Sequence, residues 1–122
     1  MSIAVIQGNT ANIDFIVTSE ELADGDIPQE LLEDLTSFTA VFEIYEKPTV
    51  GNPIRRVSKS IDTPDFKRGT LGKLMLTLRP EDTETLNPTS KFSYVLEIYK
   101  KTPNLERYTI SRGEFILEPR VK

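Results

Sequence analysis

Cysteine, histidine and tryptophan are all missing from this chain of 122 residues. Without cysteine the chain has no disulfide framework, no thiol nucleophile and no thiolate zinc site. The lack of histidine removes the residue that most often acts as a general base or metal ligand. The hydroxyl side chains have no activating histidine, and neither a G-x-S-x-G motif nor a glycine-rich phosphate loop is present. These absences predict a protein that is not an enzyme and that uses no cofactor.

Positive charge is also in short supply. The chain has 15 Lys and Arg residues against 19 Asp and Glu residues, which gives a formal net charge of −4. This is the wrong sign for a broad phosphate-binding face, so we expect no nucleic-acid partner. No apolar run approaches the roughly 20 residues of a membrane span, and the first eight residues lack the features of a signal peptide. We therefore expect no membrane partner, and synthesis in the cytoplasm without sequence-encoded export.

The length of the chain predicts a single domain that covers residues 1–122. Folding at this size removes about two thirds of the unfolded surface from water, so no disulfide or metal is needed to stabilise the core.

Alternation of apolar and polar residues is the dominant pattern, and it is typical of strands with one buried face. Four segments show it clearly: Ala11–Val17, Phe38–Ile44, Leu74–Leu78 and Phe92–Ile98. Three weaker candidates are Ile3–Gln7, Ile54–Ile61 and Arg107–Leu117. The last of these changes phase around Gly113, which suggests a bulge or a bend there.

Turn-forming residues separate these strands. The segment Pro48–Pro53 is typical of a hairpin loop, and Asp62–Gly72 is predicted to be an exposed loop. Short helical turns are predicted at Pro28–Leu35 and at Pro80–Leu86. About seven short strands, one or two helical turns and no long helix predict an all-β fold, an antiparallel immunoglobulin-like β-sandwich.

Two of the predicted strands resemble each other. Val, Glu and Tyr alternate on the side opposite the core in both, at Val41, Glu43 and Tyr45 and at Val95, Glu97 and Tyr99. One interpretation is convergent composition, because Val and Tyr suit any pleated surface. The other is that the two strands lie together in one sheet and expose a ridge that docks against another subunit. The candidate interface residues on this ridge are Val41, Tyr45, Val95 and Tyr99.

Ile3 and Val5 complete the set of candidate interface residues. They lie in the predicted first strand, and a terminal strand can pair with a neighbouring protein or be exchanged between copies. The alternative is that this segment is an ordinary edge strand of its own domain.

Two acidic clusters are candidates for chemical sites. The first surrounds Gly25 and comprises Glu20, Glu21, Asp24, Asp26 and Glu30, but its spacing does not match a calcium-binding loop. We expect a solvated acidic loop there and no metal site. The second comprises Glu81, Asp82 and Glu84 and is explained by the favourable position of acids at the start of a helical turn.

Several strand and turn segments follow one another in a distinctive order. They are Gln7–Thr10 leading into Ile13–Val17, then Leu35–Ile44, then Gly72–Leu78 with Pro80–Thr83, then Phe92–Ile98 and finally Arg112–Pro119. Nearly the whole chain takes part. The order resembles a small immunoglobulin-like domain of tailed-bacteriophage structural proteins, the type found at the N-terminus of upper baseplate proteins. The segment Leu22–Leu32 is longer than the corresponding connection in that family. Leu78–Thr83 also looks like a turn of antibody variable domains, but the Tyr-x-Cys that follows it there is missing.

The resemblance implies a non-enzymatic virion structural subunit from the baseplate, tail, neck or capsid surface. Its expected partners are other virion structural proteins, with copies of itself as a further candidate, and its expected location is the virion after synthesis in the host cytoplasm. The alternative is a soluble β-sandwich binding module. Such a module would recognise a carbohydrate or a host protein through loops such as Asp62–Gly72 and Asn87–Lys91.

Overall fold

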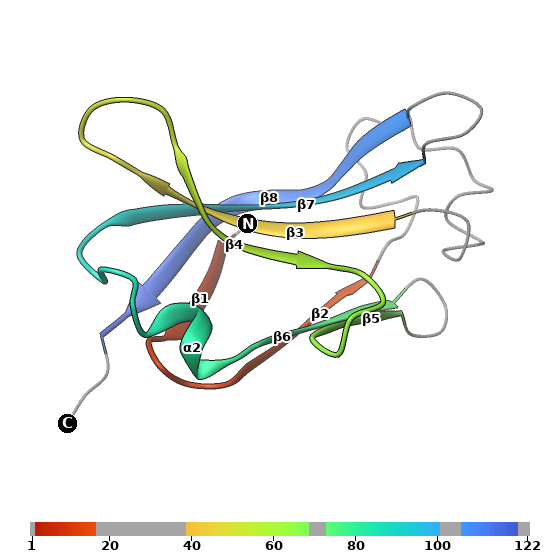
Figure 1. Ribbon diagram of the computed structural model, residues 1–122, viewed down its shortest axis with the longest axis horizontal. Helices are drawn as coiled ribbons and strands as arrows, with labels where there is room; N and C mark the ends of the chain where they lie inside the picture. Colours follow the sequence, from red (N-terminus) through yellow and green to blue (C-terminus); the bar gives the residue numbers. More distant parts are fainter. Residues whose placement is uncertain (1, 17–38, 69–72, 101–105, 120–122) are drawn as a thin grey trace.

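Two β-sheets face each other across a hydrophobic core (Figure 1). The computed structural model describes residues 2–16, 39–68, 73–100 and 106–119. In this part of the chain the larger sheet has the strand order β1-β8-β7-β3-β4 and the smaller sheet the order β2-β6-β5. The strands of the larger sheet are β1 (Ser2–Ile6), β3 (Thr39–Lys47), β4 (Ile54–Ser60), β7 (Lys91–Lys100) and β8 (Glu106–Glu118). Those of the smaller sheet are β2 (Ala11–Ile16), β5 (Phe66–Arg68) and β6 (Lys73–Leu78).

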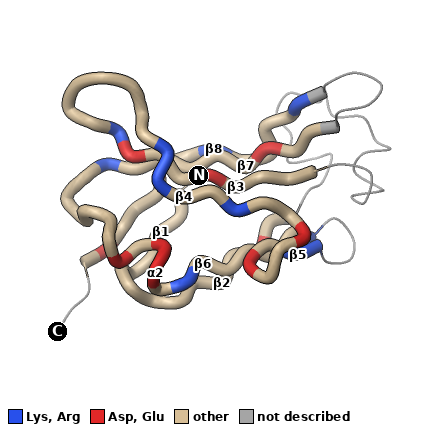
Figure 2. Tube along the Cα trace, viewed as in Figure 1, with Lys and Arg blue, Asp and Glu red and all other residues tan. Residues whose placement is uncertain are grey.

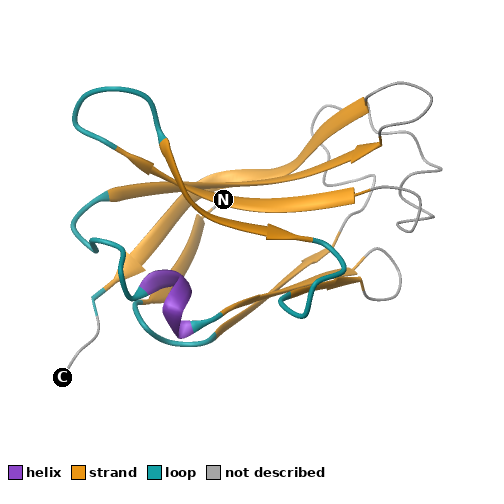
Figure 3. Cartoon of the chain, in the orientation of Figure 1, coloured by secondary structure: helices purple, strands orange, loops and turns teal. Residues whose placement is uncertain are grey.

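Strands dominate the described residues, as Figure 3 shows. A strand lies in each of the seven predicted strand segments, and the expected all-β sandwich is confirmed. The described strands pair antiparallel as predicted except at β1, which runs parallel to β8, so the prediction of a fully antiparallel fold was wrong there. The alternation has the predicted cause. Along β3 the side chains of Ala40, Phe42 and Ile44 are at most 1% exposed, whereas those between them are half-buried.

The segment Asp62–Gly72 was predicted to be an exposed loop, and this was wrong for its middle residues. Residues Phe66–Arg68 form β5 and pair with β6, and Phe66 is fully buried. A strand of three residues is too short to show alternation, so a single buried aromatic side chain was the only signal. Asp62 adopts a positive φ of 66°, which turns the chain after β4.

The phase change in β8 is present, but it lies before Gly113. Leu96 pairs with Ser111 and Glu97 pairs with Thr109, so Ile110 is the extra residue of a β-bulge. Gly113 itself pairs regularly with Tyr94. The bulge places Tyr108 and Phe115 on the same side of the sheet although their numbers differ in parity, and both contact the core.

A short helix, α2 (Pro80–Thr83), joins the two sheets at one end of the sandwich (Figure 1). It confirms the predicted turn at Pro80–Leu86. Proline occupies the first turn, and the Asp82 carboxylate accepts a hydrogen bond of 2.7 Å from the backbone N–H of Arg79. The predicted helix at Pro28–Leu35 and the acidic cluster of Glu20, Glu21, Asp24, Asp26 and Glu30 lie outside the described residues. Nowhere in the described ranges is a helix long and apolar enough to cross a membrane.

The first strand is held by pairing with β8 and, beyond its C-terminal end, by hydrogen bonds to the helical corner. β1 runs parallel to β8, with Ser2 opposite Glu114 and Ile6 opposite Glu118. Just beyond β1, the Gln7 side-chain amide donates to the backbone carbonyls of Thr83, Glu84 and Leu86 at 3.3, 3.1 and 2.7 Å. The backbone N–H of Gly8 donates to the hydroxyl of the fully buried Thr83 at 2.9 Å. These bonds hold the end of β1 against the helical corner.

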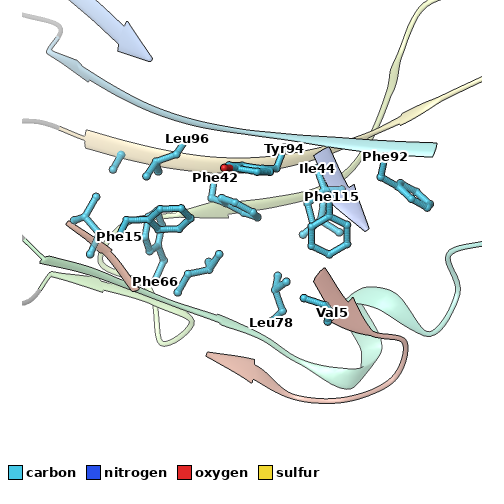
Figure 4. Close-up of a cluster of buried hydrophobic side chains, with 14 of the residues drawn as sticks. Val5, Phe15, Phe42, Ile44, Phe66, Leu78, Phe92, Tyr94, Leu96 and Phe115 are labelled. Carbon is cyan, nitrogen blue, oxygen red and sulfur yellow. The ribbon is translucent and has the colours of Figure 1, made fainter. Parts of the chain in front are cut away.

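Aromatic side chains from three strands connect the two sheets (Figure 4). Phe42 of β3 lies 5.8 Å from the ring of Tyr94 on β7 and 5.8 Å from that of Phe15 on β2. The Tyr94 hydroxyl lies 2.9 Å from that of Ser111, so the buried ring keeps a polar partner. Because Phe15 belongs to the smaller sheet and the other two rings to the larger one, this cluster fixes one layer against the other.

Candidate functional site

The predicted ridge of valine, glutamate and tyrosine side chains lies on the outer face of the larger sheet. β3 and β7 are antiparallel neighbours, with Val41 opposite Glu97 and Glu43 opposite Val95. The hypothesis that the two similar strands lie together in one sheet is therefore confirmed. Tyr45 and Tyr99 occupy the two far corners of the ridge, and all six side chains are half-buried.

Arginines from the two flanking strands partner the glutamates of this ridge. Arg55 of β4 lies opposite Tyr45 and forms an ion pair of 3.1 Å with Glu43. Arg107 of β8 lies opposite Tyr99, with its Nε 3.6 Å from a carboxylate oxygen of Glu97. The Arg107 guanidinium also lies 5.8 Å from the centre of the Tyr99 ring, within range of a cation–π contact. The two acids are thus balanced by two bases on the same surface.

The environment of the Tyr45 hydroxyl shifts its pKa. Burial raises the pKa of its hydroxyl, and the neighbouring Glu43 carboxylate raises it further by repelling a phenolate. The hydroxyl donates a hydrogen bond of 3.2 Å to Glu43. Tyr45 is therefore a neutral hydrogen-bond donor at physiological pH and is poorly suited to act as a base or nucleophile.

The ridge borders an open hollow of about 740 Å³. Its lining combines aromatic, charged and hydroxyl side chains: Val41, Glu43, Tyr45, Arg55, Ser58, Ser60, Glu97, Tyr99 and Arg107. A second hollow of about 580 Å³ lies between β4 and the helical corner and includes Glu46, Arg56, Glu81 and Asp82. The first is the more apolar of the two, although Val57 and Leu86 also line the second. We therefore take the outer face of the larger sheet as the candidate contact surface.

A charged cluster beside the second hollow has a structural role. The ammonium group of Lys59 on β4 lies 2.9 Å from an Asp65 oxygen and 2.8 Å from an Asp82 oxygen, and Arg79 binds Asp65 at 2.6 Å. Figure 2 shows the basic positions on β4 and the acidic positions on α2. Burial alone would lower the pKa of Lys59, but hydrogen bonds to Asp82 and Asp65 outweigh this and the pKa is raised. These contacts connect β4, the segment before β5 and α2.

The two predicted interface residues of the first strand serve the core. Val5 is 6% exposed and belongs to the buried cluster, and Ile3 packs against that cluster. The outward positions of β1 are Ser2, Ala4 and Ile6, of which Ile6 is 42% exposed. The side chains of Ile3 and Val5 thus lie apart from the Val41, Tyr45, Val95 and Tyr99 ridge. Strand pairing or exchange through β1 stays a prediction.

The residues that sequence reasoning missed are Arg55 and Arg107. Both lie in segments that were predicted as weak strands, but their alignment with Tyr45 and Tyr99 depends on strand pairing and on the two bulges of this sheet. Within the described residues no group of three or more metal-binding side chains comes together. The ridge is a mixed apolar and charge-balanced surface, and such surfaces suit contacts with proteins.

The chain matches no protein-family model and no curated protein.

Proposed function

We propose that the chain is a non-enzymatic structural subunit of a tailed-bacteriophage particle, from its baseplate, tail, neck or capsid surface. It acts through contacts with other virion structural proteins. The observation that carries the proposal is the outer face of the larger sheet, where Val41, Tyr45, Val95 and Tyr99 form one half-buried ridge. The resemblance of the segment order to phage immunoglobulin-like domains supplies the biological setting.

The proposal includes an immunoglobulin-like arrangement of the strands. In such domains strands B, E and D form one sheet, and strands C, F and G form the other. If β2, β6 and β5 take the places of B, E and D, then β3, β7 and β8 take those of C, F and G. β4 then extends the second sheet beside C, as an additional strand does in variable-type domains. The chain order of all these strands agrees with this assignment.

The aromatic cluster supports the same arrangement. Immunoglobulin domains of antibodies join strands B and F by a disulfide that packs on a tryptophan of strand C. Here Phe15, Tyr94 and Phe42 lie on the corresponding strands β2, β7 and β3, and the Phe42 ring contacts each of the other two. Aromatic packing between the sheets thus replaces the covalent link, which a cysteine-free chain cannot form.

The placement of the aromatic side chains favours this function over capture of a ligand by loops. Part of the predicted binding loop Asp62–Gly72 forms β5 and buries Phe66 in the core. Tyr45 and Tyr99 lie on strands, and strands present a rigid surface of fixed spacing. A rigid face that carries tyrosine and arginine side chains suits contacts between protein subunits.

Mass spectrometry of purified particles tests the proposal directly. Particles of a phage that encodes the chain should contain it in a constant ratio to the major structural proteins. Val95→Arg should reduce its incorporation, whereas the matched change Val50→Arg, at an 88% exposed loop position, should not. Absence of the unaltered chain from the particles would contradict the proposal.

A further inference from the structure

The outer face of the larger sheet repeats itself around a local two-fold axis. β3 and β7 are antiparallel, and their outer side chains pair as Val41 with Glu97 and as Glu43 with Val95. A half-turn about an axis perpendicular to the sheet, passing between Phe42 and Leu96, therefore exchanges the two strands. It exchanges Val41 with Val95, Glu43 with Glu97 and Tyr45 with Tyr99.

The flanking strands follow the same symmetry. Arg55 is the neighbour of Tyr45 and the ion-pair partner of Glu43, and Arg107 has the same relation to Tyr99 and Glu97. The hydroxyl residues also correspond, since the axis relates Ser58 to Thr109 and Thr39 to Ser93. The match ends at Ser60 and Arg112, which occupy related positions but differ in charge.

The inner face of the same two strands lacks this symmetry. The axis relates Ala40 to Tyr94 and Phe42 to Leu96, and only Ile44 and Ile98 correspond. Packing of the core therefore does not require a repeated pattern. The composition of the two strands does not by itself produce one either. The repetition is confined to the face that the fold leaves open.

We infer that this face binds a second copy of the chain, face to face and with two-fold symmetry. The inference rests on the proposed function in taking this face as a contact surface. The chain carries a formal net charge of −4, so two copies repel each other at most orientations. On this face Glu43 and Glu97 are balanced by Arg55 and Arg107, so the repulsion between two copies is weaker in this orientation.

The pattern of the ridge is also complementary to itself. A copy turned about an axis that lies in the interface, parallel to the strands, places its Val41 over Glu97 and its Val95 over Glu43. No carboxylate then faces another carboxylate, and each glutamate keeps its own arginine partner. Such an interface is isologous, because the same patch serves both copies. The hollow beside the ridge provides space for a tyrosine of the other copy.

Sedimentation velocity on the full chain tests the inference. We expect a reversible dimer between about 1 µM and 1 mM. Val41→Arg and Val95→Arg should each raise its dissociation constant at least about tenfold. Both variants should weaken the dimer, and Val95→Arg more strongly, because Val95 already lies opposite Arg112 whereas Val41 lies opposite Ser60. Val50→Arg should leave the constant unchanged. A chain that stays monomeric throughout this range, or a dimer that neither ridge variant weakens, would overturn the inference.

Cross-linking gives a second readout that does not depend on disrupting the surface. Because the chain has no cysteine, Val95→Cys provides a single thiol close to the local axis. A short bismaleimide should join two copies of this variant, whereas Val50→Cys should stay uncoupled. Val95→Thr retains a β-branched side chain and, with thermal unfolding curves for every variant, separates loss of contact from loss of fold.

These results are distinguishable from the fate of the proposed function. A monomeric chain whose ridge variants are still lost from particles would refute the second-copy inference and leave the structural function standing. A ridge-dependent dimer that is absent from particles would do the reverse.

Discussion

The two faces of the β3–β7 strand pair differ in what they contribute to the molecule. Inward, Phe42, Ile44, Leu96 and Ile98 are fully buried and contact the opposite sheet. Outward, the valines, glutamates and tyrosines one residue away are only half-buried, and the two glutamates pair with arginines of the neighbouring strands. Residues on one strand thus divide between stabilising the fold and forming a surface. We expect changes on the inner face to alter folding and changes on the outer face to alter binding.

The largest effect is expected on the inner face, at Phe42. Phe42→Ala removes the ring that lies between Phe15 and Tyr94 and should lower the free energy of unfolding by about 3–5 kcal/mol. Urea unfolding followed by circular dichroism measures the change. The outward neighbour provides the control, because Val41→Ala should cost no more than about 1 kcal/mol. Equal losses of unfolding free energy for the two variants would contradict the view that only the inner face stabilises the fold.

The Lys59 cluster should behave like the inner face, although it is charged. Lys59→Met keeps the length of the side chain but removes the ammonium group between Asp65 and Asp82. We expect a loss of about 2 kcal/mol, since these hydrogen bonds join charged groups at a partly buried position. The matched change on the outer face, Arg55→Met, breaks an exposed ion pair and should cost at most about 1 kcal/mol. Urea unfolding gives the loss of unfolding free energy for each variant, and Lys59→Met should lose more than Arg55→Met.

Gln7 tests whether the edge strand depends on its attachment to the helical corner. Gln7→Ala removes the donor to the carbonyls of Thr83, Glu84 and Leu86 and should cost about 1–2 kcal/mol. Amide hydrogen exchange should accelerate in β1 and remain slow in β7. Exchange that accelerates equally in both strands would mean that β1 does not open independently of the core.

Acid should weaken the corner between the sheets before it affects the aromatic cluster. Hydrogen bonds from Lys59 and Arg79 hold the pKa of Asp65 below its ordinary value. Because the folded pKa is the lower one, this stabilisation is complete above the unfolded-state pKa and is lost as pH falls through the folded pKa. Urea midpoints should therefore decrease below about pH 4, and Asp65→Asn should flatten that dependence. An unchanged slope in the variant would assign the acid sensitivity to other carboxylates.

The smallest effect is expected on the outer face, at Glu97. Glu97→Gln weakens a partner of the exposed Arg107 and should change the free energy of unfolding by no more than about 0.5 kcal/mol. Thermal and urea unfolding at low protein concentration measure the monomer alone. A loss as large as that of Lys59→Met would show that the outer face also stabilises the fold.

Much of this architecture could be predicted from the sequence because burial imposes a two-residue period. The period located β3, β6 and β7, and it also placed Val41 and Val95 on the side opposite the core. It could not reveal β5, whose three residues are shorter than any detectable pattern. Nor could it locate the bulge at Ile110, because the change of phase is visible only between Tyr108 and Phe115, with several residues in between.

The arginines of the candidate surface were out of reach for a different reason. Their positions follow from which strands are neighbours, and β4 and β8 lie beside β3 and β7 through pairings that an alternating pattern does not specify. Only the register aligns Arg55 with Tyr45 and Arg107 with Tyr99. The local two-fold symmetry therefore becomes visible only when all four strands are in place.

The parallel pairing of β1 with β8 has a consequence for how the molecule assembles. It joins residues as far apart in the chain as Ser2 and Glu114, and contacts between such distant residues form slowly because a long loop must close first. During synthesis on the ribosome, Val5 has no partner strand until β8 has emerged. We expect the β3–β4 and β7–β8 hairpins, whose strands follow one another in the chain, to form first, and β1 to be the last strand to dock.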